Sequence, residues 1–229
     1  RDIVAGNILV RKHLGIDRVD VLIGPSIGGF QAYEWAVTEP DVFSRVIFLA
    51  TTDRCTPYMT AFNESQRMAL LSDPTFGEAA SLSGGKAGLA CARSIAMLSY
   101  RTFEGYNRTQ SEADPDTLFA DRAASYQRYQ GKKLADRFDA YSYWYLTCAL
   151  DSHNIGRGRG GVDAALGRIK AKTMIINIDS DNLFPPQPGR DTASKIAGAE
   201  YHEMSSAFGH DGFLLEYGAL SALMAPFIL

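Results

Sequence analysis

One stretch constrains the fold of this chain more than any other: an apolar run that enters a G-x-S-x-G turn and leaves it as a helix-like pattern. Residues 19–23 form a short segment rich in β-branched side chains, which is typical of a parallel strand buried on both faces. Gly24 and Gly28 flank Ser26, and side chains there would clash if the strand and the following helix pass closely. The pattern predicts a strained Ser26 that projects above a sheet as a nucleophile. The alternative is an ordinary glycine-rich turn with a solvated serine.

The bulk composition fits a globular protein and gives no sign of a nucleic-acid or membrane partner. The 229 residues suffice for one sizeable core and an inserted subdomain. Apolar content is 46%, charged content is 21% and the net charge is −3, so no charge excess attracts nucleic acid or anionic lipid. Cys55, Cys91 and Cys148 are scattered without a C-x-x-C spacing. This favours free thiols in a cytoplasmic protein over a disulfide framework or a metal site.

The order of the patterns predicts an α/β fold with a mostly parallel sheet. An amphipathic helix over residues 2–14, with Ile3, Val4, Ile8 and Leu14 roughly on one side, ends at Gly15 and precedes the nucleophile strand. A second buried strand spans 43–50. We assign residues 1–56 and 171–229 to one α/β core. The second core segment contains strands at 172–178 and 199–204, the latter suited to a sheet edge, followed by helices at 189–197 and 213–229 and a loop at 205–212.

Residues 57–170 interrupt this core and read as a helical lid over the active site. They hold helical patterns and no convincing strand, and we expect helices at 61–71, 88–100, 120–130 and 139–150 and a loop over 108–115. The insertion is rich in tyrosine, at Tyr126, Tyr129, Tyr141, Tyr143 and Tyr145. These rings fit two readings equally, half-buried packing surface or the lining of an active-site tunnel or subunit interface.

A serine nucleophile needs a base, and the base needs an orienting carboxylate. Acidic residues follow the third strand and His210 follows the fourth, which gives the chain order Ser, Asp, His of the α/β-hydrolase fold. His210 lies on a loop between glycines, where an active-site histidine is expected, whereas His13, His153 and His202 suit structural positions. The pattern leaves the acid open between Asp179 and Asp181. The amide of Ile27, at the start of the elbow helix, is the expected oxyanion donor.

With these residues in hand, the chain resembles the homoserine O-acetyltransferase family within the α/β-hydrolase superfamily. The resemblance runs through nearly the whole chain and is far more specific than the G-x-S-x-G turn. It rests on residues 14–16, 26–36, 61–67, 88–96, 126–131, 137–143, 181–186 and 209–214. One departure is the elbow, Gly-Pro-Ser-Ile, where the family usually has Gly-Gly-Ser-Met; Pro25 fixes its own φ and permits a modest change of geometry.

The resemblance implies roles for several residues. It assigns the triad acid to Asp181, completing Ser26 and His210. It matches Arg93 to an arginine that binds the substrate carboxylate, Tyr100 to a substrate-facing tyrosine, and Asp211 to an aspartate that binds the substrate amino group. Arg93 and Tyr100 are seven residues apart, so a helix places them on one side. The alternatives are a surface ion pair for Arg93 and a helix cap for Asp211.

The implied activity is ping-pong transfer of an acetyl group from acetyl-CoA to homoserine, a step of methionine biosynthesis. Coenzyme A is then a co-substrate, and neither a bound cofactor nor a metal is implied. A homodimer formed through the lid is expected. Serine O-acyltransferase, homoserine O-succinyltransferase and esterase activities are the alternatives. The resemblance also places early strands and a second oxyanion donor ahead of Arg1, so an incomplete, inactive piece of a longer enzyme is a further reading.

Overall fold

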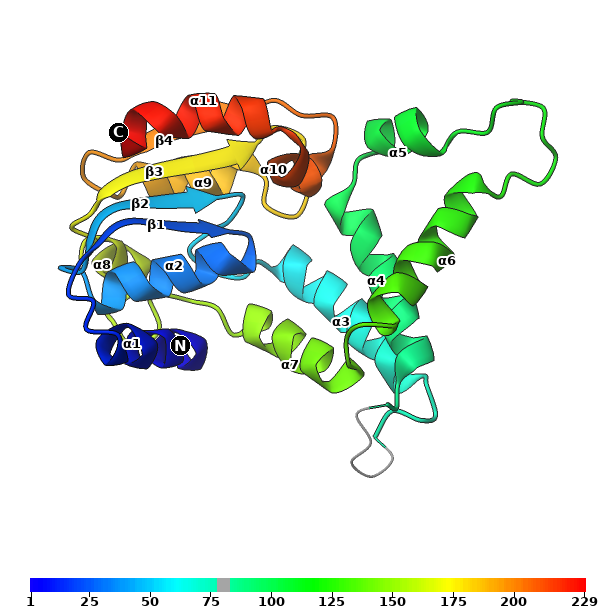
Figure 1. The fold of residues 1–229 in the computed structure, drawn as a ribbon, viewed down its shortest axis with the longest axis horizontal. Helices are drawn as coiled ribbons and strands as arrows, with labels where there is room; N and C mark the ends of the chain where they lie inside the picture. The colour runs from blue at the N-terminus through cyan, green and yellow to red at the C-terminus, as the bar shows by residue number, and fades with distance from the viewer. Residues whose placement is uncertain (78–82) are drawn as a thin grey trace. The chain divides into compact units, whose positions relative to one another are not determined.

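The computed structural model describes residues 1–77 and 83–229, which form two compact units (Figure 1). The α/β unit consists of Arg1–Arg54, His153–Ser206 and His210–Leu229. The helical unit consists of Cys55–Ser152 with the short segment Ala207–Gly209. Its main segment ends at Ser152, earlier than the predicted insertion, so residues 153–170 group with the sheet. That the helical unit acts as a lid stays a prediction.

All four predicted strands are present in the α/β unit and form one parallel sheet. They are β1 (Val19–Pro25), β2 (Phe43–Leu49), β3 (Lys172–Ile178) and β4 (Glu200–Met204), in the order β1-β2-β3-β4. The register pairs Gly24 with Phe48 and Ile178 with Met204, so the carboxyl ends of the strands lie along one edge of the sheet. The predicted edge position of β4 is confirmed, and the loops that follow β1, β3 and β4 leave from that common edge.

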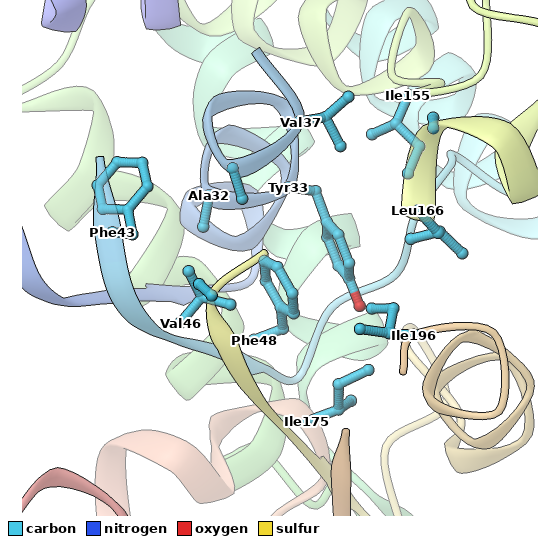
Figure 2. Packing of buried hydrophobic residues seen from close by; sticks show 13 residues of the cluster. Ala32, Tyr33, Val37, Phe43, Val46, Phe48, Ile155, Leu166, Ile175 and Ile196 are labelled. Carbon is cyan, nitrogen blue, oxygen red and sulfur yellow. The ribbon is translucent and has the colours of Figure 1, made fainter. Parts of the chain in front are cut away.

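Alternate residues of the central strands pack into two separate cores. Val46 and Phe48 of β2 face one cluster, whereas Ile47 and Leu49 face the other. The first cluster contains Tyr33, whose ring stacks on Phe48, with side chains from α2, α8 and the segment after α9 around it (Figure 2). The second lies beneath α11. The helices therefore cover both faces of the sheet, as the burial of successive side chains on both faces of β2 and β3 requires.

The helices of the α/β unit follow the predicted order with shifted ends. They are α1 (Asp2–His13), α2 (Ile27–Thr38), α8 (Val162–Leu166), α9 (Pro186–Ala193), α10 (Gly212–Leu215) and α11 (Tyr217–Ile228), with a 3₁₀ turn at Gly209–Asp211. Gly15 follows α1 with φ +66°, the left-handed conformation expected of a helix-ending glycine. The predicted helix over 213–229 is wrong in one respect, because the chain leaves helical geometry at Glu216 (φ −93°, ψ 53°) and splits it into α10 and α11.

Two predictions about burial in this unit are wrong. The nucleophile strand β1 is not buried on both faces, because it lies at the end of the strand order and Ile23 is 44% exposed. In α1 the apolar residues do not form one buried face: Val4 is buried, but Ile3 and Leu14 are exposed. Both elements lie at one margin of the sheet layer, where fewer neighbouring side chains cover them.

The helical unit holds the helices α3 (Pro57–Leu71), α4 (Lys86–Tyr100), α5 (Phe103–Gln110), α6 (Arg122–Ala135) and α7 (Ala140–Asp151). Four of them were predicted; α5 was not, and it occupies the start of the segment expected to be a loop. Glycines let the helices cross closely, since a Cβ at Gly131 would lie 2.5 Å from the Ala90 carbonyl oxygen. The carboxylate of Asp73, which follows α3, accepts a 2.9 Å hydrogen bond from the Gly88 amide in the first turn of α4.

Candidate active site

The turn between β1 and α2 has the geometry of a nucleophile elbow. Ser26 has φ 53° and ψ −125°, a conformation that non-glycine residues rarely adopt, so the predicted backbone strain is confirmed. The close passage of strand and helix is confirmed at Gly24, where a Cβ would lie 2.4 Å from the Gly28 carbonyl oxygen. It is weaker at Gly28, whose Cβ would meet only the Pro25 ring at 3.3 Å. The tighter second position is Gly29, where a Cβ would lie 2.3 Å from the Thr51 side chain.

The structure brings Ser26, His210 and Asp181 into one hydrogen-bonded relay. The Nε2 atom of His210 lies 2.8 Å from the Ser26 hydroxyl oxygen, and its Nδ1 atom lies 2.7 Å from an Asp181 carboxylate oxygen. A carboxylate can only accept, so in the neutral imidazole Nδ1 carries the proton and Nε2 offers its lone pair to the serine hydroxyl. His210 is 4% exposed and Asp181 is 2% exposed, which keeps this relay out of bulk water.

Backbone amides hold Asp181 in place and separate its position from that of Asp179. One oxygen of Asp181 accepts hydrogen bonds from the amides of Leu183 at 2.8 Å and Phe184 at 2.9 Å, while the other faces His210. Asp179 instead accepts a 3.1 Å hydrogen bond from the Ser206 amide, so it ties together the loops after β3 and β4. Of the two carboxylates that the sequence pattern left open, Asp181 is the one in contact with the imidazole.

Aromatic rings fix the plane of the His210 imidazole. Phe184 stacks against it with ring centroids 5.0 Å apart, and Phe213 meets it edge-on at 5.2 Å. Phe30, on the elbow helix, packs against Phe184 and also stacks on His153 at 3.8 Å. These rings were not predicted as part of the site. Their signal in the sequence is their adjacency to Ser26, Asp181 and His210 along the chain.

The start of α2 supplies the amide expected to stabilise an oxyanion. Ile27 is the first residue of α2, where amide groups have no partner within the helix. Two residues further along, the amides of Gly29 and Phe30 donate to the Ser26 carbonyl oxygen at 2.9 and 3.3 Å. The Ile27 amide is thus the one that directly follows Ser26, at the positive end of the helix dipole.

Of the remaining predicted site residues, Arg93 and Tyr100 belong to the helical unit and Asp211 belongs to the α/β unit. Within the helical unit, the Arg93 guanidinium lies 5.4 Å from the centre of the Tyr100 ring, so this predicted pair is brought together. Tyr143 of α7 donates a hydrogen bond to the buried Gln66 side chain, and burial raises the pKa of Tyr143. In the α/β unit, Asp211 lies at the start of α10 but its side chain does not cap that helix.

The other histidines have structural surroundings, as expected. His13 is exposed on the last turn of α1, and His202 lies in β4 with Nε2 3.7 Å from a Glu200 carboxylate oxygen. His153 belongs to the α/β unit and not to the helical insertion, and burial lowers its pKa to about 4. Cys55, Cys91 and Cys148 are free thiols.

In residues 1–77 and 83–229 no three histidine, cysteine, aspartate or glutamate side chains are grouped closely enough to hold a metal ion. No helix within that same part of the chain combines the length and apolarity needed to cross a membrane.

Comparison with known proteins places this geometry in a family. The chain is 42% identical over 229 residues to a protein of Cyclobacterium marinum named homoserine O-acetyltransferase, covering 100% of this chain and 65% of that relative. Among solved structures, homoserine O-acetyltransferase from Staphylococcus aureus superposes with a TM-score of 0.80 at 32% identity, over 99% of this chain and 64% of that chain. An acetylester hydrolase from Corynebacterium glutamicum gives a TM-score of 0.78 at 26% identity, over 92% of this chain and 60% of that one.

The first two of these proteins bear the name of the family that the sequence resembles. This chain spans less than two thirds of the length of each of the three. The family model of the alpha/beta hydrolase fold matches residues 1–217, which include the elbow, the Asp181 loop and the His210 turn. With the parallel sheet and the relay from Ser26 to Asp181 in place, the chain belongs to the α/β-hydrolase fold family.

Proposed function

We propose that this protein is an acyltransferase that moves an acetyl group from acetyl-CoA to the side-chain hydroxyl of L-homoserine, a step of methionine biosynthesis. The observation that carries the proposal is the relay of Ser26 with the buried His210 and Asp181, in a chain that is 42% identical to a protein named homoserine O-acetyltransferase. Acetyl-CoA and homoserine are substrates in this proposal, and a homodimer formed through the helical unit remains part of it.

In the first half-reaction Ser26 becomes acetylated. Its Oγ attacks the thioester carbonyl carbon while His210 Nε2 takes the hydroxyl proton, and the Asp181 carboxylate stabilises the imidazolium. The negative charge that develops on the carbonyl oxygen is stabilised by the Ile27 amide. When the tetrahedral intermediate collapses, the carbon–sulfur bond breaks, His210 returns the proton to the departing sulfur, and an acetyl-serine ester remains.

In the second half-reaction homoserine takes the place of coenzyme A. Arg93 offers a planar guanidinium to the substrate carboxylate, with Tyr100 beside it, and Asp211 binds the ammonium group. His210 removes the proton from the homoserine hydroxyl as its oxygen attacks the acetyl-serine carbonyl. Collapse of this intermediate breaks the bond to Ser26 Oγ, and His210 returns the proton to that oxygen. The product is O-acetylhomoserine.

The second candidate function is ester hydrolysis by the same triad. It is favoured by the match to the acetylester hydrolase from Corynebacterium glutamicum, which shares the fold at 26% identity. Water would then replace homoserine in the second half-reaction, so the two functions differ only in the acceptor. Transfer to serine, or of a succinyl group, changes the substrate but not the chemistry.

Acyl partition separates these functions. The protein made from its full reading frame is incubated with acetyl-CoA or succinyl-CoA, with homoserine, with serine or with neither, while free coenzyme A and O-acyl amino acid are measured. Transferase activity predicts that coenzyme A release rises with homoserine and matches O-acetylhomoserine formed. Release of coenzyme A that is indifferent to every amino acid would rule out the transferase.

The nucleophile is tested in the same assay with Ser26→Ala. The substitution removes only the hydroxyl group, so the variant should lose acyl-enzyme formation entirely. Mass spectrometry of the acetyl-CoA-treated protein detects this loss as a missing acetyl adduct. An adduct that persists on the variant would mean that another residue is the nucleophile.

A further inference from the structure

We infer that Thr51 is a positioning residue that sets the direction of the Ile27 amide. This rests on the proposed function, in which that amide stabilises the oxyanion. Thr51 follows β2, and its hydroxyl donates a 2.9 Å hydrogen bond to the carbonyl oxygen of Ser26. This hydrogen bond goes to the backbone of Ser26 and not to its side chain, so Thr51 acts through the backbone of the elbow.

The covalent geometry of the peptide group converts this hydrogen bond into control of the amide. The Ser26 carbonyl and the Ile27 amide belong to one planar peptide group, and the described chain contains no cis peptide bond. In a trans peptide the C=O and N–H vectors point in opposite directions. A hydroxyl that fixes the carbonyl oxygen therefore fixes where the Ile27 N–H points.

The packing around Thr51 is built for this contact. Thr51 is 1% exposed, and its side chain fills the space that a Cβ on Gly29 would occupy, at a separation of only 2.3 Å. The residue before it, Ala50, has φ +46° and donates its amide to the Ile176 carbonyl oxygen at 2.8 Å. The left-handed conformation of Ala50 thus places the hydroxyl of Thr51 against the backbone of Ser26, which is itself strained.

Hydrogen-bond satisfaction alone does not explain the contact. The Ser26 carbonyl oxygen already accepts from the amides of Gly29 and Phe30, so it would not be left unpaired without the hydroxyl. Those two donors come from the helix that begins at the elbow, whereas Thr51 is anchored in the sheet. The third donor therefore ties the peptide to the sheet as well as to α2, which is how a rigid scaffold preorganises an oxyanion donor.

The test compares Thr51→Val, which keeps the shape and removes the hydroxyl, with Thr51→Ser, which keeps the hydroxyl. Thr173→Val is the matched control, because Thr173 is also 1% exposed and donates to a backbone carbonyl, that of Ala171 at 2.9 Å. Two measurements are made on the protein from its full reading frame. One is the rate of Ser26 labelling by a fluorophosphonate, with the kcat and KM for p-nitrophenyl acetate. The other is the orientation of the 26–27 peptide in crystal structures.

We expect Thr51→Val to slow labelling and lower kcat by about tenfold or more with KM little changed, since loss of an oxyanion donor costs about a hundred- to a thousand-fold and a misdirected donor loses part of that. Thr51→Ser and Thr173→Val should stay within about threefold of the wild-type rate. The 26–27 peptide should turn in Thr51→Val and keep its orientation in Thr51→Ser.

Wild-type labelling of Thr51→Val, equal losses in Thr51→Ser, or an unmoved peptide in Thr51→Val would each overturn the inference. If the wild-type protein itself is not labelled at Ser26, the proposed function fails instead. The peptide orientation in the two Thr51 variants then still decides whether Thr51 positions the amide.

Discussion

A buried hydroxyl without a partner lies on the elbow helix at Tyr33. The ring stacks on Phe48 at a centroid distance of 3.6 Å, and the oxygen points toward Ile196 (Figure 2). Among the described residues nothing hydrogen-bonds to it, and burial raises the pKa of Tyr33. Tyr33→Phe removes the desolvated oxygen and keeps the ring, so we expect the free energy of unfolding, measured by urea titration, to stay constant or rise by about 1 kcal/mol.

The matched control is the same substitution at Tyr143. That hydroxyl donates to the side-chain oxygen of Gln66, which is 5% exposed, so Tyr143→Phe leaves a buried acceptor unpaired. We expect it to lose about 1–3 kcal/mol of stability. If Tyr33→Phe were to cost as much as Tyr143→Phe, the Tyr33 hydroxyl would have to make a compensating interaction in solution.

Arg93 tests the acceptor side of the proposed reaction. Its guanidinium lies against the Tyr100 ring, and in the proposed function it binds the homoserine carboxylate. Arg93→Ala should therefore leave the acetylation of Ser26 by acetyl-CoA near the wild-type rate and slow transfer to homoserine by about a hundredfold, as expected when a charge-assisted bidentate contact is lost. Single-turnover kinetics measures the two steps separately. Equal loss in both half-reactions would refute this role.

At the scale of elements, β1 and α2 can cross closely because Gly24 has no side chain. A Cβ at Gly24 would lie 2.4 Å from the Gly28 carbonyl oxygen and 2.7 Å from the Ala32 Cβ. Gly24→Ala must push the helix from the strand, and we expect a loss of about 3 kcal/mol or more in urea unfolding, together with slower labelling of Ser26.

The control for this prediction is Gly6→Ala in α1. A Cβ at Gly6 would meet nothing within 4 Å, and alanine is the better helix former. It should raise stability by about 0.5–1 kcal/mol. If both alanine variants changed stability in the same direction, the crowding at Gly24 would not be the cause.

Elements with a strong local signal were predicted, and those shaped by their neighbours were not. The strands β2 and β3 are apolar runs buried on both faces, which the sequence states directly. The apolar run of β1 contains Asp20, and its exposure also depends on its place in the sheet order, which one segment cannot reveal. The helix α5 was missed although Thr102, its N-cap, accepts a 2.9 Å hydrogen bond from the Gly105 amide; only its last residues, 108–110, fall in the segment predicted as a loop.

For the whole molecule, the triad was predictable because parallel strands share an edge. Ser26 and His210 are 184 positions apart, yet both follow strands whose carboxyl ends lie together, so chain order sufficed to pair them. The choice of Asp181 over Asp179 needed the resemblance to a family. The contact of Thr51 with the Ser26 carbonyl oxygen was not predicted, since it depends on the register in which β1 and β2 pair.

The pH dependence of folding should carry the signature of one histidine in the α/β unit. His153 stacks on Phe30 and its Nε2 lies 3.3 Å from the Thr52 carbonyl oxygen, while burial lowers its pKa to about 4. In the unfolded chain its pKa is about 6.5, so between pH 6.5 and 4 the unfolded state binds a proton that the folded state does not. Stability is then complete above pH 6.5 and falls as the pH drops to 4, by at most about 3 kcal/mol.

Glu34 acts in a lower pH range and can be told apart from His153. Burial alone would raise the pKa of Glu34, but its hydrogen bonds with Arg159 outweigh that and hold the pKa below its usual value. Its contribution is therefore lost only below its unfolded pKa of about 4.3, where the carboxylate becomes protonated. A decline in stability between pH 6.5 and 4.5 thus belongs to His153.

Urea unfolding at a series of pH values measures this decline. His153→Phe keeps an aromatic ring against Phe30 and cannot be protonated, so its free energy of unfolding should change less than that of the wild type between pH 6.5 and 4.5. His13→Gln removes an exposed histidine of α1 and should keep the wild-type slope. Because the slope assigned to His153 comes from a proton taken up only by the unfolded chain, an unchanged slope in His153→Phe would contradict the burial of a neutral His153.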